Sequence, residues 1–224
     1  MRRFRYSALV ASLAVLPAAA VAQSQFEGVI TMRMTTGQGP MDMAYSVKGD
    51  RFRMDMTGMG GMAVYTIHDA STNTNTMVLP ARKMYMETSG AQGMASPEGK
   101  GKAPTIKMTG KTETIAGLQC EHMIVSSDDG VDYDVCAAKG LGTYFIGGNP
   151  MGMRGGRGAP PAAEAWQHLG TNTFPLKVQR VGGDVSMEVT KIEKKSLDDD
   201  LFKVPSDFQK FDMGGMGRGR PPRI

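Results

Sequence analysis

The chain has 224 residues, 20 of them methionine, and a formal net charge of +4. A membrane-spanning helix needs about 18 or more consecutive apolar residues, and no segment after residue 22 approaches that length. Nucleic-acid binding has little support, because three of the 26 Lys and Arg lie in the N-terminal leader and leave 23 basic residues against 22 acidic ones.

Residues 1–22 have the pattern of a cleaved export signal. Arg2, Arg3 and Arg5 precede a short apolar core at 8–17, and small residues at 20 and 22 form a cleavage site. We therefore expect a periplasmic or secreted protein that begins at Gln23 and has no stable membrane anchor.

The remaining chain suits a single domain over residues 23–212. Strand-like runs recur along it and are joined by short turns of Gly, Asn, Asp or Ser, which favours an antiparallel meander. These runs are 26–36, 41–48, 51–56, 62–68, 74–80, 83–88, 105–115, 118–126, 131–137, 174–181 and 184–195. One helix is predicted at 160–169 and a short helical turn at 198–201. Residues 213–224, rich in Gly, Arg and Pro, are predicted to be a disordered tail.

Four Met-x-Met pairs fall on the predicted strands. They are Met32/Met34, Met41/Met43, Met54/Met56 and Met84/Met86. Residues two apart on a strand point to the same side of the sheet, so each pair adds two thioethers to one face. In the first three strands the same positions also carry Ile30, Tyr45, Val47 and Phe52, whereas the alternate positions carry polar and charged residues. The sequence predicts one apolar, methionine-rich face and one solvent-exposed face.

The methionines support two different interpretations. Flexible thioethers adapt to an apolar partner, which predicts binding of a hydrophobic or lipid-like ligand. That binding face would comprise Ile30, Met32, Met34, Met41, Met43, Tyr45, Val47, Phe52, Met54, Met56, Met84 and Met86, together with Trp166 on the predicted helix. Thioethers also select Cu(I), and the alternative copper site is Met54, Met56, Met59 and Met62.

Two cysteines in an exported chain usually form a disulfide. Cys120 and Cys136 lie on two predicted strands that flank a turn at 127–130, which would bring them opposite each other. Closing this loop is expected to contribute roughly 3 kcal/mol in the chain-entropy model. A metal-binding or catalytic pair more often has Cys-x-x-Cys spacing, which this sequence lacks.

The sequence offers no recognisable catalytic centre. His68, His122 and His168 show no ligand spacing, and no hydrolase, metalloprotease, P-loop or dinucleotide-binding motif occurs. We therefore predict a protein that is not an enzyme and needs no cofactor. A structural or interaction module of the cell envelope, without a small ligand, is the third alternative.

Segments 111–122, 129–136, 174–178 and 188–205 resemble an exported bacterial family known as domain of unknown function 4412. The closing pattern Ile192…Leu201-Phe202-x-x-Pro205 is shared more loosely with outer-membrane lipoprotein carriers of the LolA/LolB-like superfamily. This wider resemblance implies a mainly β fold, in which a curved antiparallel sheet forms an incomplete (half) barrel with a short helix as lid. It also implies acyl chains held against the concave face, and no catalytic residues.

The export signal predicts where the mature protein starts. N-terminal sequencing of protein recovered from the native host should find Gln23 as the first residue. Retention of residues 1–22 would contradict export through this signal.

Overall fold

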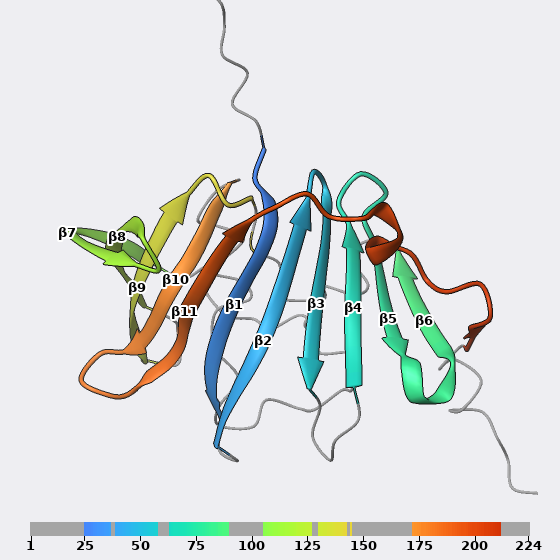
Figure 1. The fold of residues 1–224 in the computed structure, drawn as a ribbon. Coiled ribbons are helices and arrows are strands. Elements are labelled where there is room, and N and C mark those ends of the chain that lie inside the picture. The colour runs from blue at the N-terminus through green and yellow to red at the C-terminus, as the bar shows by residue number, and fades with distance from the viewer. Residues whose placement is uncertain are drawn as a thin grey trace, which may run out of the picture.

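The computed structural model describes residues 25–36, 39–57, 63–89, 105–126, 130–142, 144 and 172–211. In this part of the chain twelve strands form one open, curved sheet (Figure 1), and the helices are two short 3-10 turns. The order across the sheet is β12-β6-β5-β4-β3-β2-β1-β11-β10-β9-β8-β7. The predicted mainly β fold with an open, curved antiparallel sheet is confirmed. The predicted leader, the helix at 160–169 and the tail lie outside the described residues.

The observed strands follow the predicted runs to within about two residues at each end. They are β1 (Glu27–Thr36), β2 (Gly39–Lys48), β3 (Arg51–Thr57), β4 (Ala63–Asp69), β5 (Thr74–Leu79), β6 (Met84–Ser89), β7 (Thr105–Ile115), β8 (Leu118–Ser126), β9 (Asp132–Lys139), β10 (Thr173–Arg180) and β11 (Val185–Lys194). The sequence did not predict β12 (Gln209–Lys210), which pairs in parallel with β6. Every other strand pair in the described sheet is antiparallel.

The two 3-10 turns are η1 (Pro80–Arg82) and η3 (Asp199–Phe202). The η3 turn matches the short helical turn predicted at 198–201, and the Asp198 side chain caps it by accepting a hydrogen bond from the Asp200 backbone N–H. Neither turn is long and apolar enough to cross a membrane, and no other helix is present among the described residues.

The C-terminal segment crosses one face of the sheet as a strap, defined here as residues 195–208. Figure 1 shows it running from the end of β11 across the ends of β1 to β5 before the chain reaches β12 beside β6. Leu197 and Phe202 of the strap are buried against Tyr65, Ile67 and Val78 of β4 and β5. The strap therefore gives this face a second, smaller apolar core.

Basic side chains of β2 and β3 hold the strap in place. Lys48 Nζ donates to the carbonyl of Leu197 at 2.6 Å, and Arg53 Nη1 donates to the carbonyl of Leu201 at 3.0 Å. The Arg53 guanidinium also lies 3.7 Å from the centre of the Tyr65 ring. The sequence pattern predicted that this face is solvent-exposed, and at these positions the prediction is wrong. Long basic side chains cover apolar surface with their stems and reach backbone carbonyls with their charged ends.

Carboxylates complete the attachment of the strap. Glu27 accepts a 2.7 Å hydrogen bond from the Leu197 backbone N–H, and this bond is the main reason why the pKa of Glu27 is lowered. Asp199 lies 2.6 Å from Arg51 Nη2 and 3.0 Å from Lys48 Nζ, which lowers the pKa of Asp199. Both carboxylates are therefore held in the charged form that the basic side chains need.

Replacing Arg53 with Ala should weaken the strap. The change removes a charge-assisted hydrogen bond to Leu201 and the contact with the Tyr65 ring, so we expect a loss of about 2 kcal/mol in the free energy of unfolding. Urea unfolding measures this loss, and limited proteolysis should cut the strap sooner.

The matched control for this prediction is Arg33→Ala on β1. Arg33 pairs with Asp42 at 2.7 Å, but both side chains are more than half exposed, at 56% and 55%. Exposed pairs of this kind contribute little, so the control should unfold like the parent protein. Equal destabilisation by the two substitutions would contradict the role given to Arg53.

Candidate functional site

The methionine face is the side of the sheet that carries Ile30, Met32, Met43, Tyr45 and Met54. Strand pairing confirms that the four Met-x-Met pairs share this side, because Tyr45 pairs with Met54 and Met77 pairs with Met86 across strands that stay in register. Within β1 to β4 this face carries no charged Asp, Glu, Lys or Arg among the described residues. The face is therefore a continuous apolar surface rich in thioethers.

Two rows of three methionines cross the strands near the β1–β2 hairpin. Strand pairing places Met56, Met43 and Met32 in one row. It places Met41, Met34 and Met187 in the next row, which continues onto β11. Side chains directly opposite each other on neighbouring strands have Cβ atoms roughly 5 Å apart, so the central methionine of each row lies next to the other two.

Burial divides the predicted binding residues into a core and a rim. Ile30, Met32, Tyr45 and Val47 are at most 1% exposed, and Met43, Phe52 and Met54 are also buried. The rim is defined here as Met34, Met41 and Met56, which are half-buried and packed against that core. Met84 and Met86 are also half-buried, on β6. The rim and the β6 pair are the methionines of the four pairs that remain partly accessible to a ligand.

Aromatic rings fill the centre of the methionine face. The Tyr144 ring lies 4.9 Å from Phe174 and 5.8 Å from Tyr45, and its hydroxyl lies 4.0 Å from the Met32 sulfur. Burial raises the pKa of the Tyr144 hydroxyl well above its ordinary range, so that group stays protonated. These buried rings form the floor of the face, whereas the rim carries methionine side chains with more rotatable bonds.

Two polar residues, His68 and Asn75, lie opposite each other on β4 and β5 within the methionine face. His68 is 6% exposed and stacks on Phe52 with ring centres 5.9 Å apart, and Asn75 lies opposite it on β5. Desolvation is the main cause that lowers the pKa of His68. The imidazole is therefore neutral at neutral pH and adds no charge to the apolar face.

Met187 on β11 and Met77 on β5 belong to this face although neither was assigned to it from the sequence. Neither has a methionine two residues away, so the Met-x-Met pattern passes over them. Only the strand order, which places β11 beside β1, reveals that Met187 extends the row of Met34. Trp166, Met59 and Met62, which were predicted as ligand or copper contacts, lie outside the described residues.

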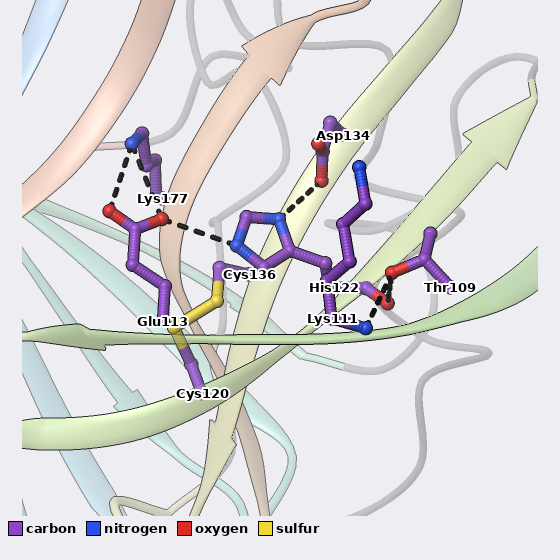
Figure 2. The surroundings of a disulfide bond; sticks show 8 residues. All are labelled: Thr109, Lys111, Glu113, Cys120, His122, Asp134, Cys136 and Lys177. Atoms are coloured by element: carbon purple, nitrogen blue, oxygen red, sulfur yellow. Dashed lines mark hydrogen bonds and ion pairs between the residues drawn. A yellow bond between two sulfur atoms is a disulfide. The ribbon is translucent and has the colours of Figure 1, made fainter.

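The predicted disulfide is confirmed, with Cys120 and Cys136 bonded and their Cα atoms 5.4 Å apart. The expected register is wrong, because Cys136 pairs directly with His122 and not with Cys120. The bond therefore runs diagonally across the β8–β9 hairpin, and His122 lies beside it (Figure 2). The two cysteines lie on strand positions that alternate with Met123 and Val135, which face the methionine side.

The buried imidazole of His68 predicts a pH dependence of stability. The pKa of His68 in the folded protein is below its ordinary value of 6.5. The contribution of the neutral imidazole to the free energy of unfolding is therefore fully present above pH 6.5, and it is lost as the pH falls through the pKa of the folded protein. The free energy of unfolding should therefore decrease between neutral pH and about pH 5, measured by urea unfolding.

His68→Gln should remove this part of the pH dependence. Glutamine keeps a polar side chain at the position but does not titrate, while the carboxylates with lowered pKa, such as Asp199, respond alike in both proteins. Identical pH profiles for the parent and the variant would show that His68 does not contribute.

Comparisons with known proteins establish a family but no specific role. Among solved structures, PNGF-II in its C2 crystal form matches with a TM-score of 0.50 and 16% sequence identity over 86% of this chain. The match spans 32% of the PNGF-II chain and concerns the fold alone. MucB matches with a TM-score of 0.38 and 11% identity, over 83% of this chain and 58% of its own.

No curated protein matches the sequence. The sequence model described as Domain of unknown function (DUF4412) matches residues 26–208, which is most of the chain and nearly all of the described sheet. The chain therefore belongs to the DUF4412 family.

Proposed function

We propose that this is an exported, periplasmic, non-enzymatic protein that holds a hydrophobic or lipid-like ligand against its methionine face. The observation that carries the proposal is the common orientation of the four Met-x-Met pairs across strands in register. An apolar face that extends over this many strands suits an extended apolar molecule such as an acyl chain.

The rim is the part of the face that suits a variable ligand. Met34, Met41 and Met56 are half-buried, and methionine side chains have three rotatable bonds and a polarisable sulfur. They can repack around ligands of different shape while the aromatic floor stays fixed. The absence of charged side chains from this face in the described parts of β1 to β4 favours an apolar ligand over an ionic one.

Export is supported by two independent features. The leader has the pattern of a cleaved signal, and Cys120 and Cys136 form a disulfide of the kind that persists in oxidising compartments. A hydrophobic-ligand protein in that compartment would carry its ligand through an aqueous space between membranes or surfaces.

Copper(I) binding is the second candidate function, and strand pairing favours it at a different place from the one predicted. Met41, Met34 and Met187 are neighbours in one row across three strands, and their thioethers are the kind of ligand that a soft monovalent cation prefers. Of the predicted copper ligands, only Met54 and Met56 lie on described strands.

Met34→Asp should weaken binding of a fluorescent fatty-acid analogue by about tenfold or more, because placing a carboxylate against an apolar ligand costs several kcal/mol. Fluorescence titration measures the dissociation constant. The matched control is Thr35→Asp, which adds the same charge one residue away on the opposite, exposed side of β1. Equal loss from both variants, or no binding by the parent protein, would contradict the proposal.

Leucine substitutions separate the two candidate functions. Replacing Met34, Met41 and Met187 with Leu keeps apolarity and approximate volume, so lipid-type binding should persist. Copper(I) binding should fail, because leucine has no sulfur ligand. Native mass spectrometry of protein purified from its own compartment would report either a lipid mass or bound copper.

A further inference from the structure

A cluster of chemically reactive side chains, separate from the methionine rows, surrounds the disulfide on β7, β8 and β9 at one end of the sheet (Figure 2). Glu113 of β7, His122 of β8 and Cys136 of β9 present a carboxylate oxygen, a ring nitrogen and a sulfur that all lie within 4.8 Å of one another. Cys120 adds a second sulfur, which is bonded to Cys136. Three adjacent strands thus bring three potential metal-ligand groups to one place, and the disulfide holds a fourth, the Cys120 sulfur, next to Cys136.

His122 is already oriented as a metal ligand. Its Nδ1 atom lies 2.7 Å from Asp134 Oδ1, and a carboxylate that accepts from Nδ1–H leaves Nε2 as the ligand atom. Metal-binding histidines commonly have this arrangement, in which a carboxylate fixes the ring from behind. The Nε2 atom points toward Glu113, at 3.2 Å from Oε2 (Figure 2).

The 3.2 Å between His122 Nε2 and Glu113 Oε2 has room for either a ring N–H that donates to Glu113 or a metal ion that both atoms bind. Two acceptor atoms 3.2 Å apart repel each other unless a proton or a metal ion lies between them. In the disulfide form, both sulfurs are used by the S–S bond and offer no thiolate. The arrangement is therefore two ligands short of a tetrahedral metal site for as long as the bond is intact.

We infer that reduction of the Cys120–Cys136 bond creates a site for a zinc-like divalent cation, bound by both thiolates, His122 Nε2 and the Glu113 carboxylate. Two thiolates, one imidazole and one carboxylate form a four-ligand set that zinc accepts. The inference concerns the face opposite the methionine face and does not depend on the proposed ligand binding.

The chemistry requires a reductant, which we take to be a dithiol such as a thiol–disulfide oxidoreductase. The dithiol transfers two electrons to the S–S bond and becomes a disulfide itself, and its two protons pass to the sulfurs of Cys120 and Cys136. The incoming divalent cation then displaces both protons as the thiolates bind it.

The charges around the reduced site favour binding of a divalent cation. The reduced, metal-binding form has two thiolates and the carboxylates of Glu113 and Asp134, and the ammonium of Lys177 lies 3.2 Å from Glu113 Oε1. A divalent cation neutralises most of the excess negative charge. Cys120 and Cys136 are only 2% and 1% exposed, so two unpaired thiolates would otherwise be left in a buried place.

The test uses the mature protein, reduced with a phosphine under argon and titrated with Co²⁺ as a spectroscopic probe. We expect one equivalent of Co²⁺ to bind with sulfur-to-cobalt charge-transfer absorption, and Zn²⁺ to displace it. The disulfide form should show no such absorption. Failure of the reduced protein to bind Co²⁺ would overturn the inference.

Variants identify the ligands. His122→Ala should weaken the Co²⁺ affinity by at least about tenfold, and Asp134→Asn by about 10–100-fold through loss of ring orientation. The control is Glu121→Gln on the same strand, whose side chain is exposed and lies at an alternate position. Unchanged affinity in His122→Ala would show binding by the cysteines alone and would overturn the site.

Circular dichroism covers the case in which reduction unfolds the chain. The inference then requires that one equivalent of Zn²⁺ restores the β-sheet signal in the reduced protein, and that it does not do so in His122→Ala. A reduced protein that stays unfolded with Zn²⁺ present would count against the inference as directly as a folded protein that binds no metal.

Discussion

The two-residue period of the strands is the constraint on which the rest of this structure depends. In β1 to β3 every second residue over 30–34, 41–47 and 52–56 is a methionine, an aliphatic residue or an aromatic ring. The residues of the other parity include Arg33, Arg51 and Arg53. A shift of one residue in strand pairing would bury these guanidinium groups and expose the thioethers. The alternation therefore fixes the register of the central strands, and the register in turn aligns the methionine rows.

The same constraint creates a second surface that has to be stabilised. The face opposite the methionines carries Tyr65, Ile67 and Val78, and a sheet that left them in water would lose their burial energy. The strap supplies that cover with Leu197 and Phe202. Because arginine and lysine reach backbone carbonyls of the strap, the charged positions of β2 and β3 contribute to its packing.

Sequence patterns predicted the strands well because each strand carries its own alternation and is bounded by turn residues. They also identified that Met32 and Met34 share one side of β1 and that Met54 and Met56 share one side of β3, since each follows from spacing within one strand. Features that depend on partners distant in sequence were not accessible. The membership of Met187 in a methionine row needs β11 beside β1, and the position of His122 beside the disulfide needs the true register of the β8–β9 hairpin. The partial burial of Arg53 depends on a strap residue, Leu201, that lies 148 residues further along the chain.

The disulfide and the methionine rows lie on different strands of one sheet, and alternation along β9 links their positions. Val135, on the methionine side, pairs with Val178 and Met123, and the next residue in the chain is Cys136. A covalent bond at Cys136 therefore also fixes the part of β9 that Val135 occupies on the other face. A metal ion bound by Cys120, Cys136, His122 and Glu113 would join β7, β8 and β9, where the disulfide joins only β8 and β9. Exchange of the disulfide for the metal ion would replace one cross-link between these strands by another. The strands would keep their positions, and the apolar face depends on those positions.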